Sequence, residues 1–446
     1  MKNILIIAYE CAPYNRPGST IGAQRPYQFA KYLPQNGWRS IVLCCDYSRR
    51  YTLHPTSNWK EYIDNQIVND LNNWKENESL VIALPSLKYE DIVDRIWLST
   101  VELDATNGTF IAKQGIWNLM KRKASSFVKL LSGDHSQSWQ KVALYAINVI
   151  HRKQITINGL LAEHGPNAGL YVANKTHRKY QIPWVVDARD PLLMGYPKFL
   201  KNIVFLWYKY YLIATAKALI NVNPIWVASE GNSFGKNAYL ITNGYEPEEF
   251  KYLVPQRTRL DESIVILYYG NIYPFQDIEG FLNELGEICK SESMFKKQIQ
   301  FQYFGNAYES IRLLIKKYGL LNNFSGGYSI SRKELFEKGK NADMLLLLSV
   351  APYKKDIPKD FVEGFYPGKV FEYLGFEIPI LCYPGDNGIL SDFVNKTGSG
   401  YTISRGQLYD FIKQSKRLVS KLTFQTFQYT RKEQSIKLIK VLDEIF

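Results

Sequence analysis

Short apolar runs alternate with amphipathic segments at the beginning of the chain, and proline and glycine separate them. Asn3–Ala8 is a continuous apolar run, a helical pattern extends from Gly22 to Leu33, and Ser40–Cys45 is again apolar. Continuous apolar runs of this length are typical of strands buried on both faces, as in parallel sheets. The order strand, loop, helix, strand therefore predicts the start of a doubly wound α/β domain.

The same alternation begins again in the second half, after a polar segment at residues 250–262 that is typical of a linker. Strands are predicted there, with helical patterns between them, at residues 264–269, 299–304, 324–328, 344–350, 379–381 and 401–403. Helical patterns over 407–419 and 427–445 end the chain. The sequence thus predicts two α/β domains in series, each with a mostly parallel sheet.

The segment at residues 46–140 is less regular. It predicts a strand at Val81–Leu84 and a helix over Phe110–Leu131. Residues 105–133 contain basic side chains and no acidic ones, so this helix either lies on an anionic membrane or presents a solvated face. The basic residues are Lys113, Lys121, Arg122, Lys123 and Lys129.

The most membrane-like segment is Ile203–Val222, but Lys209 and Lys217 interrupt it. The pattern predicts a helix over Ile203–Leu219 that belongs to the fold, with at most an interfacial position, and no transmembrane span.

Composition changes this picture mainly through charge. The 446-residue chain carries a formal net charge of +13 and has a pI near 9.2, which favours an anionic partner. Nucleic acid is disfavoured because the sequence contains no Lys/Arg block and no zinc-finger spacing. A membrane surface and a phosphorylated small molecule remain as the candidate anionic partners.

The five cysteines are scattered and lie mostly inside apolar runs. This pattern fits buried thiols in a reducing compartment, and the absence of CxxC and of Cys/His clusters predicts no metal site. The first apolar run is too short for a signal peptide and leads into a turn. We therefore expect a cytoplasmic protein.

The segment Glu363–Leu374 places a turn, a cation and a carboxylate close together. Pro367 and Gly368 signal a turn, and Lys369 begins a short helix whose unpaired N–H groups suit a phosphate. Glu372 lies one turn further on the same face. A cation for phosphate beside a carboxylate for sugar hydroxyls predicts a nucleotide-sugar pocket, and the alternative is an ordinary helix start with a solvated Lys–Glu pair.

Three charged residues, Asp187, Arg189 and Asp190, follow the apolar run Trp184–Val186. Charges at a strand end are costly unless they are paired or functional. In doubly wound sheets, ligands bind beyond the carboxyl ends of the strands. The pattern therefore favours a role in a site, with a structural Arg–Asp bridge as the alternative.

These motifs and their order resemble retaining glycosyltransferase family 4, whose members have the GT-B fold. Except for residues about 50–130, the resemblance extends along nearly the whole chain. The matching stretches are Lys2–Gly22 with Arg25, Val185–Pro191, Ile241–Phe250, Tyr269–Asn271, Phe324–Gly327, Gly368–Leu374 and Pro379–Leu381. Each stretch is a weak signal alone, whereas the ordered set is fairly specific.

The resemblance implies two Rossmann-like domains that face each other across a cleft. Residues 1–250 would bind the acceptor, with residues about 50–130 as an atypical, insertion-like region. Residues 255–423 would bind a nucleotide-sugar donor, most simply a UDP- or GDP-sugar. The final helix, 424–446, would pack back on the first domain. No metal and no further cofactor are implied, because helix ends and basic side chains neutralise the diphosphate.

The resemblance also assigns a donor site. Glu372 matches the second Glu of the family's Glu-x7-Glu motif, which holds the donor ribose, whereas Gly364 stands where the first Glu belongs. Either a longer loop delivers Glu363 to the sugar, or Lys369 takes over phosphate contacts. The other implied donor contacts are Gly270, Asn271, Gly327, Tyr328, Gly368 and Arg25.

For catalysis, the family often has a His where this chain has Arg189. In a retaining, front-face reaction the leaving phosphate can itself accept the proton of the acceptor hydroxyl. We expect Asp190 or Asp187 to orient or deprotonate the acceptor, while Arg189 supports the negative charge. Gly22 and His164 are expected on the acceptor side.

The implied function is sugar transfer to a glycan or lipid-linked acceptor in bacterial cell-surface polysaccharide or glycoconjugate synthesis. The basic segments add an expected peripheral contact with an anionic membrane, at the inner face of the plasma membrane. One alternative is a nucleotide-sugar epimerase, which shares the fold. Another is a catalytically degenerate sugar-nucleotide-binding scaffold, which the displaced Glu363 and the lack of the family's Arg and Lys after Tyr269 would suit.

Overall fold

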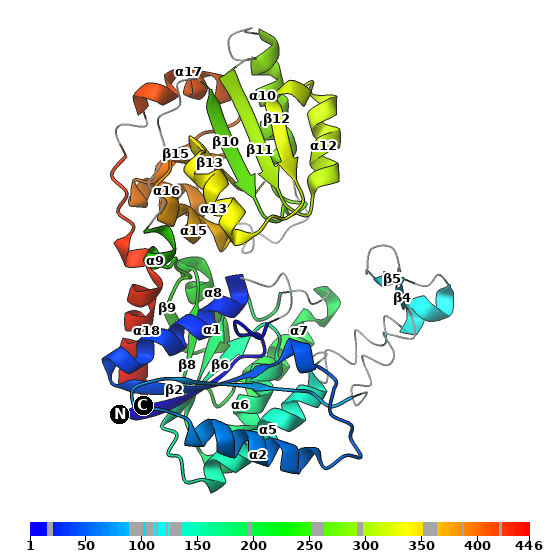
Figure 1. Cartoon of the computed structure of the whole chain (residues 1–446), viewed down its shortest axis with the longest axis vertical. Coiled ribbons are helices and arrows are strands. Elements are labelled where there is room, and N and C mark those ends of the chain that lie inside the picture. The colour runs from blue at the N-terminus through cyan, green and yellow to red at the C-terminus, as the bar shows by residue number, and fades with distance from the viewer. Residues whose placement is uncertain are drawn as a thin grey trace. The chain divides into compact units, whose positions relative to one another are not determined.

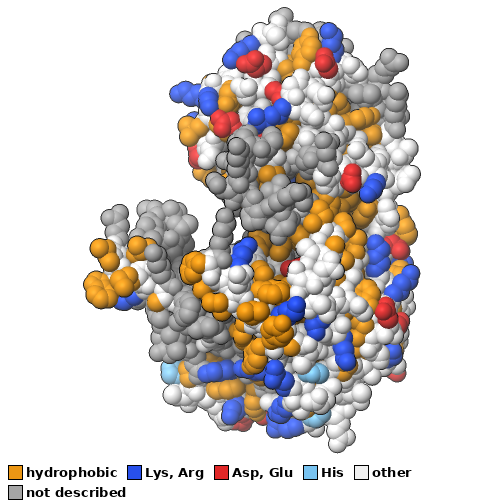
Figure 2. Space-filling view, turned by 180° about the vertical axis from the view of Figure 1, so that it is seen from behind, with side chains coloured by type: hydrophobic (Ala, Val, Ile, Leu, Met, Phe, Trp, Pro, Cys, Tyr) orange, Lys and Arg blue, Asp and Glu red, His pale blue; other side chains and the backbone are white. Residues whose placement is uncertain are grey.

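The computed structural model describes residues 1–15, 21–88, 101–103, 110–112, 115–121, 124, 136–194, 196, 198–251, 263–291, 298–350, 364–385, 388–418 and 422–446. The remaining residues are grey in Figure 1 and Figure 2. The predictions for Glu363, for four basic residues (Lys113, Arg122, Lys123 and Lys129) and for nearly all of the linker lie outside the described residues. The chain divides into unit 1, Met1–Thr242 with Gln434–Phe446, and unit 2, Asn243–Glu433.

Unit 1 is built on a seven-stranded sheet in the order β3-β2-β1-β6-β7-β8-β9, and all its neighbouring strands are parallel. The strands are β1 (Lys2–Ile7), β2 (Trp38–Cys45), β3 (Leu80–Leu84), β6 (Gly159–His164), β7 (Trp184–Ala188), β8 (Ala218–Asn221) and β9 (Asn237–Leu240). The strand order reverses between β1 and β6. This reversal is the topological switch point of a doubly wound fold, beyond which ligands bind.

Helices cover both faces of this sheet (Figure 1). They are α1 (Ile21–Tyr32), α2 (Trp59–Asn72), α5 (Gln137–Arg152), α6 (Ala168–Tyr180), α7 (Lys198–Trp207), α8 (Pro224–Phe234) and α18 (Arg431–Ile445), with the π-helical segment η3 (Tyr208–Leu212) after α7. Short 3-10 turns lie at Leu33–Asn36 (η1) and Tyr47–Arg49 (η2).

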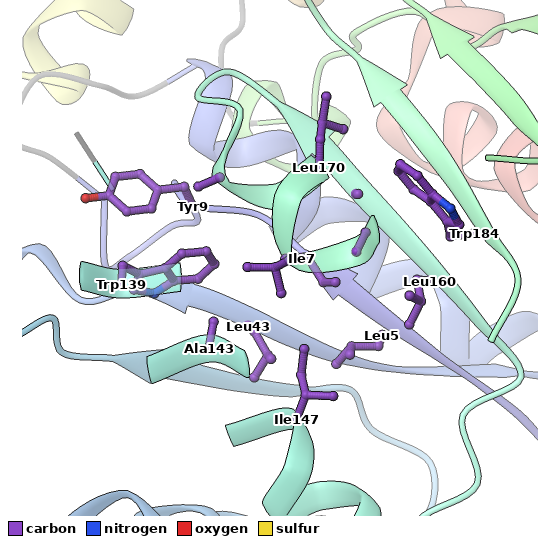
Figure 3. Close-up of a cluster of buried hydrophobic side chains, with 14 of the residues drawn as sticks. Leu5, Ile7, Tyr9, Leu43, Trp139, Ala143, Ile147, Leu160, Leu170 and Trp184 are labelled. Atoms are coloured by element: carbon purple, nitrogen blue, oxygen red, sulfur yellow. The ribbon is translucent and has the colours of Figure 1, made fainter. Parts of the chain in front are cut away.

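The two faces of the sheet have separate cores because successive strand residues point to opposite sides. Leu5 and Ile7 of β1 join the core under α2, α5 and α6, where Trp139 of α5 is fully buried (Figure 3). Ile4 and Ile6 join the core on the other face, which α1 and the end of α18 cover. The continuous apolar runs of the sequence are therefore explained by burial on both sides.

Unit 2 has a six-stranded parallel sheet in the order β12-β11-β10-β13-β14-β15, with its own switch point between β10 and β13. The strands are β10 (Ile264–Tyr269), β11 (Ile299–Phe304), β12 (Phe324–Gly327), β13 (Met344–Leu348), β14 (Ile380–Tyr383) and β15 (Gly400–Thr402). The helices are α9 (Pro247–Phe250), α10 (Ile278–Ser291), α12 (Tyr308–Lys317), α13 (Arg332–Lys340), α15 (Lys369–Phe376), α16 (Ile389–Thr397) and α17 (Leu408–Leu418), and 3-10 turns lie at Leu321–Asn323 (η4) and Phe427–Tyr429 (η6). The predicted fold class, with two Rossmann-like doubly wound domains, is confirmed.

Two predicted helices were wrong in part. The helix expected over Phe110–Leu131 begins instead with β5 (Phe110–Ala112), which pairs antiparallel with β4 (Val101–Leu103). The first residues of β5 are aromatic and β-branched and suit a strand. The helix expected over Ile203–Leu219 starts earlier, as α7, and ends with η3 at Leu212, because Ala218–Asn221 enters the sheet as β8.

Within the described ranges, no helix is both long and apolar enough to cross a membrane.

Candidate functional site

Charged side chains gather at the switch point of unit 1, where β1, β6 and β7 end. Glu10 follows β1, Glu163 and His164 end β6, and Asp187 lies near the end of β7. All four side chains are buried. Because burial makes isolated charges expensive, their arrangement depends on the arginines beside them.

Arg25 of α1 neutralises Asp187. Its Nε and Nη2 donate to the two carboxylate oxygens at 2.8 Å each, and both residues are 3% exposed in their side chains. Nη1 and Nη2 also donate to the carbonyls of Thr242 and Ile241. The pair thus fixes α1 to β7 and to the end of the sheet, which is the geometry of a structural Arg–Asp bridge.

Arg189 lies just beyond β7 and contacts two other acidic side chains. Nη1 donates to Glu163 Oε1 at 3.3 Å, and Nε lies 3.7 Å from Asp190 Oδ2. The Asp190 side chain is 49% exposed, so this carboxylate is open to a ligand. A Cβ at Gly22 would overlap the Arg189 guanidinium, so glycine is required there for the arginine to lie against α1. The sequence-predicted residues Gly22, Arg189 and Asp190 are therefore brought together.

Glu163 is an acid of this cluster whose pKa departs strongly from its usual value. Burial raises its pKa to about 8, although the neighbouring Arg189 acts in the opposite direction. Burial also lowers the pKa of His164, whose Nδ1 lies 3.2 Å from the carbonyl oxygen of Asp190. The site therefore combines a protonated carboxyl group, a neutral imidazole and an arginine near pH 7, which is suited to proton transfer beside a stabilised negative charge.

Replacing Glu163 by glutamine should change how stability depends on pH. The native carboxyl group keeps its proton up to about pH 8, whereas the same group in the unfolded chain loses it near pH 4.5. The native state therefore binds more protons between these values, and its stability falls as the pH rises through this window. Glutamine does not ionise. Between pH 5 and pH 8 the free energy of unfolding of Glu163→Gln should therefore rise by about 3–4 kcal/mol relative to that of the wild type.

Urea unfolding at pH 5, 6, 7 and 8 measures this difference. Glu337→Gln, an exposed position in α13, serves as the control and should follow wild type at every pH. A constant difference between Glu163→Gln and wild type across the series would contradict the assigned protonation state.

In unit 2, the expected cation lies at the switch point but is engaged by the protein. Lys369 Nζ donates to the carbonyls of Tyr269 at 2.9 Å and Asn271 at 3.2 Å, and it lies 3.9 Å from the centre of the Tyr268 ring. Burial lowers the pKa of Lys369 to about 7. Lys369 therefore anchors the turn after β10, around Gly270, and near pH 7 it is poised to gain a proton beside an anion.

Glu372 lies one turn further along α15 and is held by Arg332. Arg332 Nη1 donates to Glu372 Oε1 at 2.9 Å, and the Tyr269 hydroxyl donates to Oε2 at 3.2 Å. Arg332 is the first residue of α13, where a capping box between Ser331 and Glu334 fixes the helix start. Its other guanidinium nitrogen contacts Glu249.

The remaining predicted donor residues lie around the same strand ends. Gly270 has φ of +88°, a conformation that glycine adopts freely, and its carbonyl accepts from the Tyr303 hydroxyl. Gly327 ends β12, and its carbonyl accepts from the Gly305 amide. Tyr328 is 59% exposed and donates to Glu309 of α12. Gly368 directly precedes α15, and its carbonyl accepts from the Phe371 amide.

Three charged residues of these clusters, Glu10, Glu163 and Arg332, were not singled out from the sequence. Glu163 follows the apolar run of β6 much as Asp187 ends that of β7, so its place at a strand end was the available signal. Arg332 had no such signal, because it meets Glu372 only through the fold. Among the described residues, no group of His, Cys, Asp and Glu side chains is arranged to hold a metal ion.

Comparison with known proteins identifies the fold. No family model and no curated protein matches the sequence. Three solved structures each align with 100% of this chain. Sucrose-phosphate synthase from Thermosynechococcus elongatus has a TM-score of 0.58 and 11% identity over 99% of its own chain, and the lipopolysaccharide outer core galactosyltransferase WaaB has a TM-score of 0.54 and 12% identity over 100% of its chain. A protein described as a UDP-N-acetylglucosamine 2-epimerase from Listeria monocytogenes has a TM-score of 0.52 and 9% identity over 96% of its chain. The chain therefore has the GT-B fold, which is found in glycosyltransferases and in nucleotide-sugar epimerases.

Proposed function

We propose that the protein is a retaining glycosyltransferase of the family 4 type, which moves a sugar from a nucleotide-sugar donor to a glycan or lipid-linked acceptor. The observation that carries this proposal is the Lys369–Glu372 cluster at the switch point of unit 2, in a chain with the GT-B fold. Lys369 and Glu372 are the residue types that a diphosphate and a ribose require. The reaction would serve cell-surface polysaccharide or glycoconjugate synthesis in the bacterial cytoplasm, on an acceptor at the inner face of the plasma membrane.

In this proposal, unit 2 binds the donor. The diphosphate lies against the Gly270 turn, where the absence of a side chain permits close approach. Lys369 takes up a proton when the diphosphate arrives, because an adjacent negative charge favours its charged form. Glu372 accepts hydrogen bonds from the ribose hydroxyls and remains oriented by Arg332. No metal ion or cofactor takes part.

Unit 1 would bind the acceptor through its cluster at β6 and β7. The half-exposed carboxylate of Asp190 orients the acceptor hydroxyl, and Arg189 stabilises negative charge during transfer. The buried side chains of Glu163 and His164 hold Arg189 and Asp190 in position. The pair of Arg25 and Asp187 fixes the end of β7.

Donor binding can be tested by thermal shift against UDP-, GDP-, ADP- and dTDP-sugars. A ligand that binds only the folded state raises Tm, and at 100 times Kd it adds about 2.7 kcal/mol of stability. Lys369→Met and Glu372→Gln should each weaken binding of the best donor about 10- to 100-fold, because each removes a hydrogen bond from a charged group.

Lys396→Met and Glu337→Gln are matched controls on exposed helix positions of unit 2, and both should bind the donor as wild type does. Unchanged donor affinity in both Lys369→Met and Glu372→Gln would remove the basis of the proposal. Binding of a nucleotide sugar without any turnover would favour a catalytically degenerate scaffold of the same fold.

A nucleotide-sugar epimerase is the second candidate, because one of the aligned structures carries that description. An epimerase converts its nucleotide sugar without an acceptor. Turnover of the best donor should therefore be followed with and without an extract that supplies glycan and lipid-linked acceptors. Conversion that needs no acceptor would favour the epimerase.

A further inference from the structure

One surface of unit 1 carries positive charge and exposed apolar side chains together. It is formed by α5, α6, α7 and η3, and we call it the basic apolar face. α5 packs on α6, and α6 packs on η3, so the four elements are neighbours. None of them contains an Asp or Glu residue. Their described basic side chains are Lys141, Lys175, Arg178, Lys179, Lys201 and Lys209, together with Arg152, which pairs with Asp64 of α2.

An apolar stripe follows the outer side of α7 and η3. Its members recur at helical spacing and are exposed by 78%, 62%, 51% and 71%, respectively: Phe199, Ile203, Leu206 and Tyr210. The inner side of the same helix, with Val204 and Tyr208, is buried in the core. Large side chains exposed in a row on one helix mark an interaction surface rather than ordinary solvated surface. Hydrophobic side chains gather on one face of the molecule near a row of Lys and Arg side chains in Figure 2.

A pocket of about 500 Å³ lies beside this stripe, between α5, α6 and η3. Tyr171, Trp207 and Tyr211 line it, with the Trp207 and Tyr211 rings stacked at 6.2 Å between centroids. Lys141 and Lys175, both exposed, stand at its edge. Tyrosine and tryptophan with one apolar and one solvated end are enriched where proteins meet lipid headgroups.

We propose that the basic apolar face docks the protein on an anionic phospholipid bilayer. The stripe enters the boundary between headgroups and acyl chains, and Lys141 and Lys175 receive lipid phosphates at the pocket. A lipid surface fits better than a protein partner because α6, α7 and η3 carry basic residues and no acidic ones, beside a continuous apolar edge. The inference rests on the proposed function only for the choice of the membrane that carries the acceptor.

Flotation with vesicles of phosphatidylcholine, with and without one quarter phosphatidylglycerol, tests the proposal on the full chain without donor or acceptor. Wild type should float with the anionic vesicles, and less so as salt is raised. Lys141→Gln with Lys175→Gln should lower the partition coefficient about 30-fold, because each basic residue near an anionic surface contributes about fivefold. Ile203→Ser with Leu206→Ser should lower it about tenfold or more.

Matched controls lie on other surfaces. Lys31→Gln with Lys440→Gln removes the same charge from α1 and α18, on the opposite face of the sheet, and Leu313→Ser removes an exposed leucine (70%) from α12. Neither control should change flotation by more than about twofold. Failure of wild type to bind anionic vesicles, or an equal loss in the controls, would overturn the proposal. Because donor binding by thermal shift is measured separately, this result leaves the test of the proposed function intact.

Discussion

Arg25→Met is expected to lower the free energy of unfolding by about 3–5 kcal/mol, because it leaves the Asp187 carboxylate buried without its partner. Both side chains are 3% exposed, and the guanidinium also satisfies the carbonyls of Ile241 and Thr242. Urea unfolding followed by circular dichroism measures the loss. The double variant Arg25→Met with Asp187→Leu should recover much of it, because replacing a buried ion pair by apolar side chains of similar volume is often close to neutral.

An exposed ion pair of almost equal length provides the control. Lys317 and Glu279 are 2.7 Å apart, but their side chains are about half exposed. Lys317→Met should leave stability unchanged within error, since solvent screens such pairs. An effect of Arg25→Met as small as that of Lys317→Met would show that the buried pair does not hold the end of the sheet.

Arg189→Met should lower kcat about 100- to 1,000-fold if the protein transfers sugar as proposed. A loss of this size is expected when a hydrogen-bond donor to a developing negative charge is removed. Donor affinity should not change, because the donor cluster belongs to unit 2. Arg189→Lys should recover part of the rate, since it keeps the charge but loses the planar geometry that reaches Glu163 and Asp190. Initial rates measured at saturating nucleotide-sugar donor and varied acceptor separate kcat from the KM for the acceptor.

Lys75→Met is the control for this experiment. Lys75 also pairs with a carboxylate, Glu78, but its side chain is 74% exposed beyond the end of α2. This variant should have the wild-type kcat. A wild-type rate in Arg189→Met would exclude Arg189 from the reaction and direct attention to Asp190 alone.

The fold was predictable where polar or turn residues border a clear apolar run. β10 and β11 have the predicted bounds for this reason, because polar residues precede both runs and Gly270 and Gly305 follow them. α2 was not predicted, because only Ile63 and Ile67 of its 14 residues are buried and its pattern is mostly polar. A helix with so narrow an apolar stripe resembles a loop in sequence.

The positions of the candidate sites could be predicted from the sequence, but the partners of their charged side chains could not. The end of β7 with Asp187 and the helix start with Glu372 could be chosen from topology, since ligands bind beyond the carboxyl ends of parallel strands. Their partners could not, because Arg25 lies 162 residues from Asp187 and Arg332 lies 40 residues from Glu372. Such pairings depend on the register of helices against the sheet, which local pattern does not specify.

The last residues of the chain complete the first unit. The Gln434 side chain accepts a hydrogen bond from the Thr242 amide. Leu438 and Leu442 are fully buried in the core that contains Ile4 and Ile6, on one face of the sheet. During synthesis on the ribosome, this core therefore stays open until residue 442 has emerged, long after the residues of unit 2 have been made. Unit 2 can finish folding first, and the amino-terminal half must avoid aggregation with an exposed apolar sheet face while it waits.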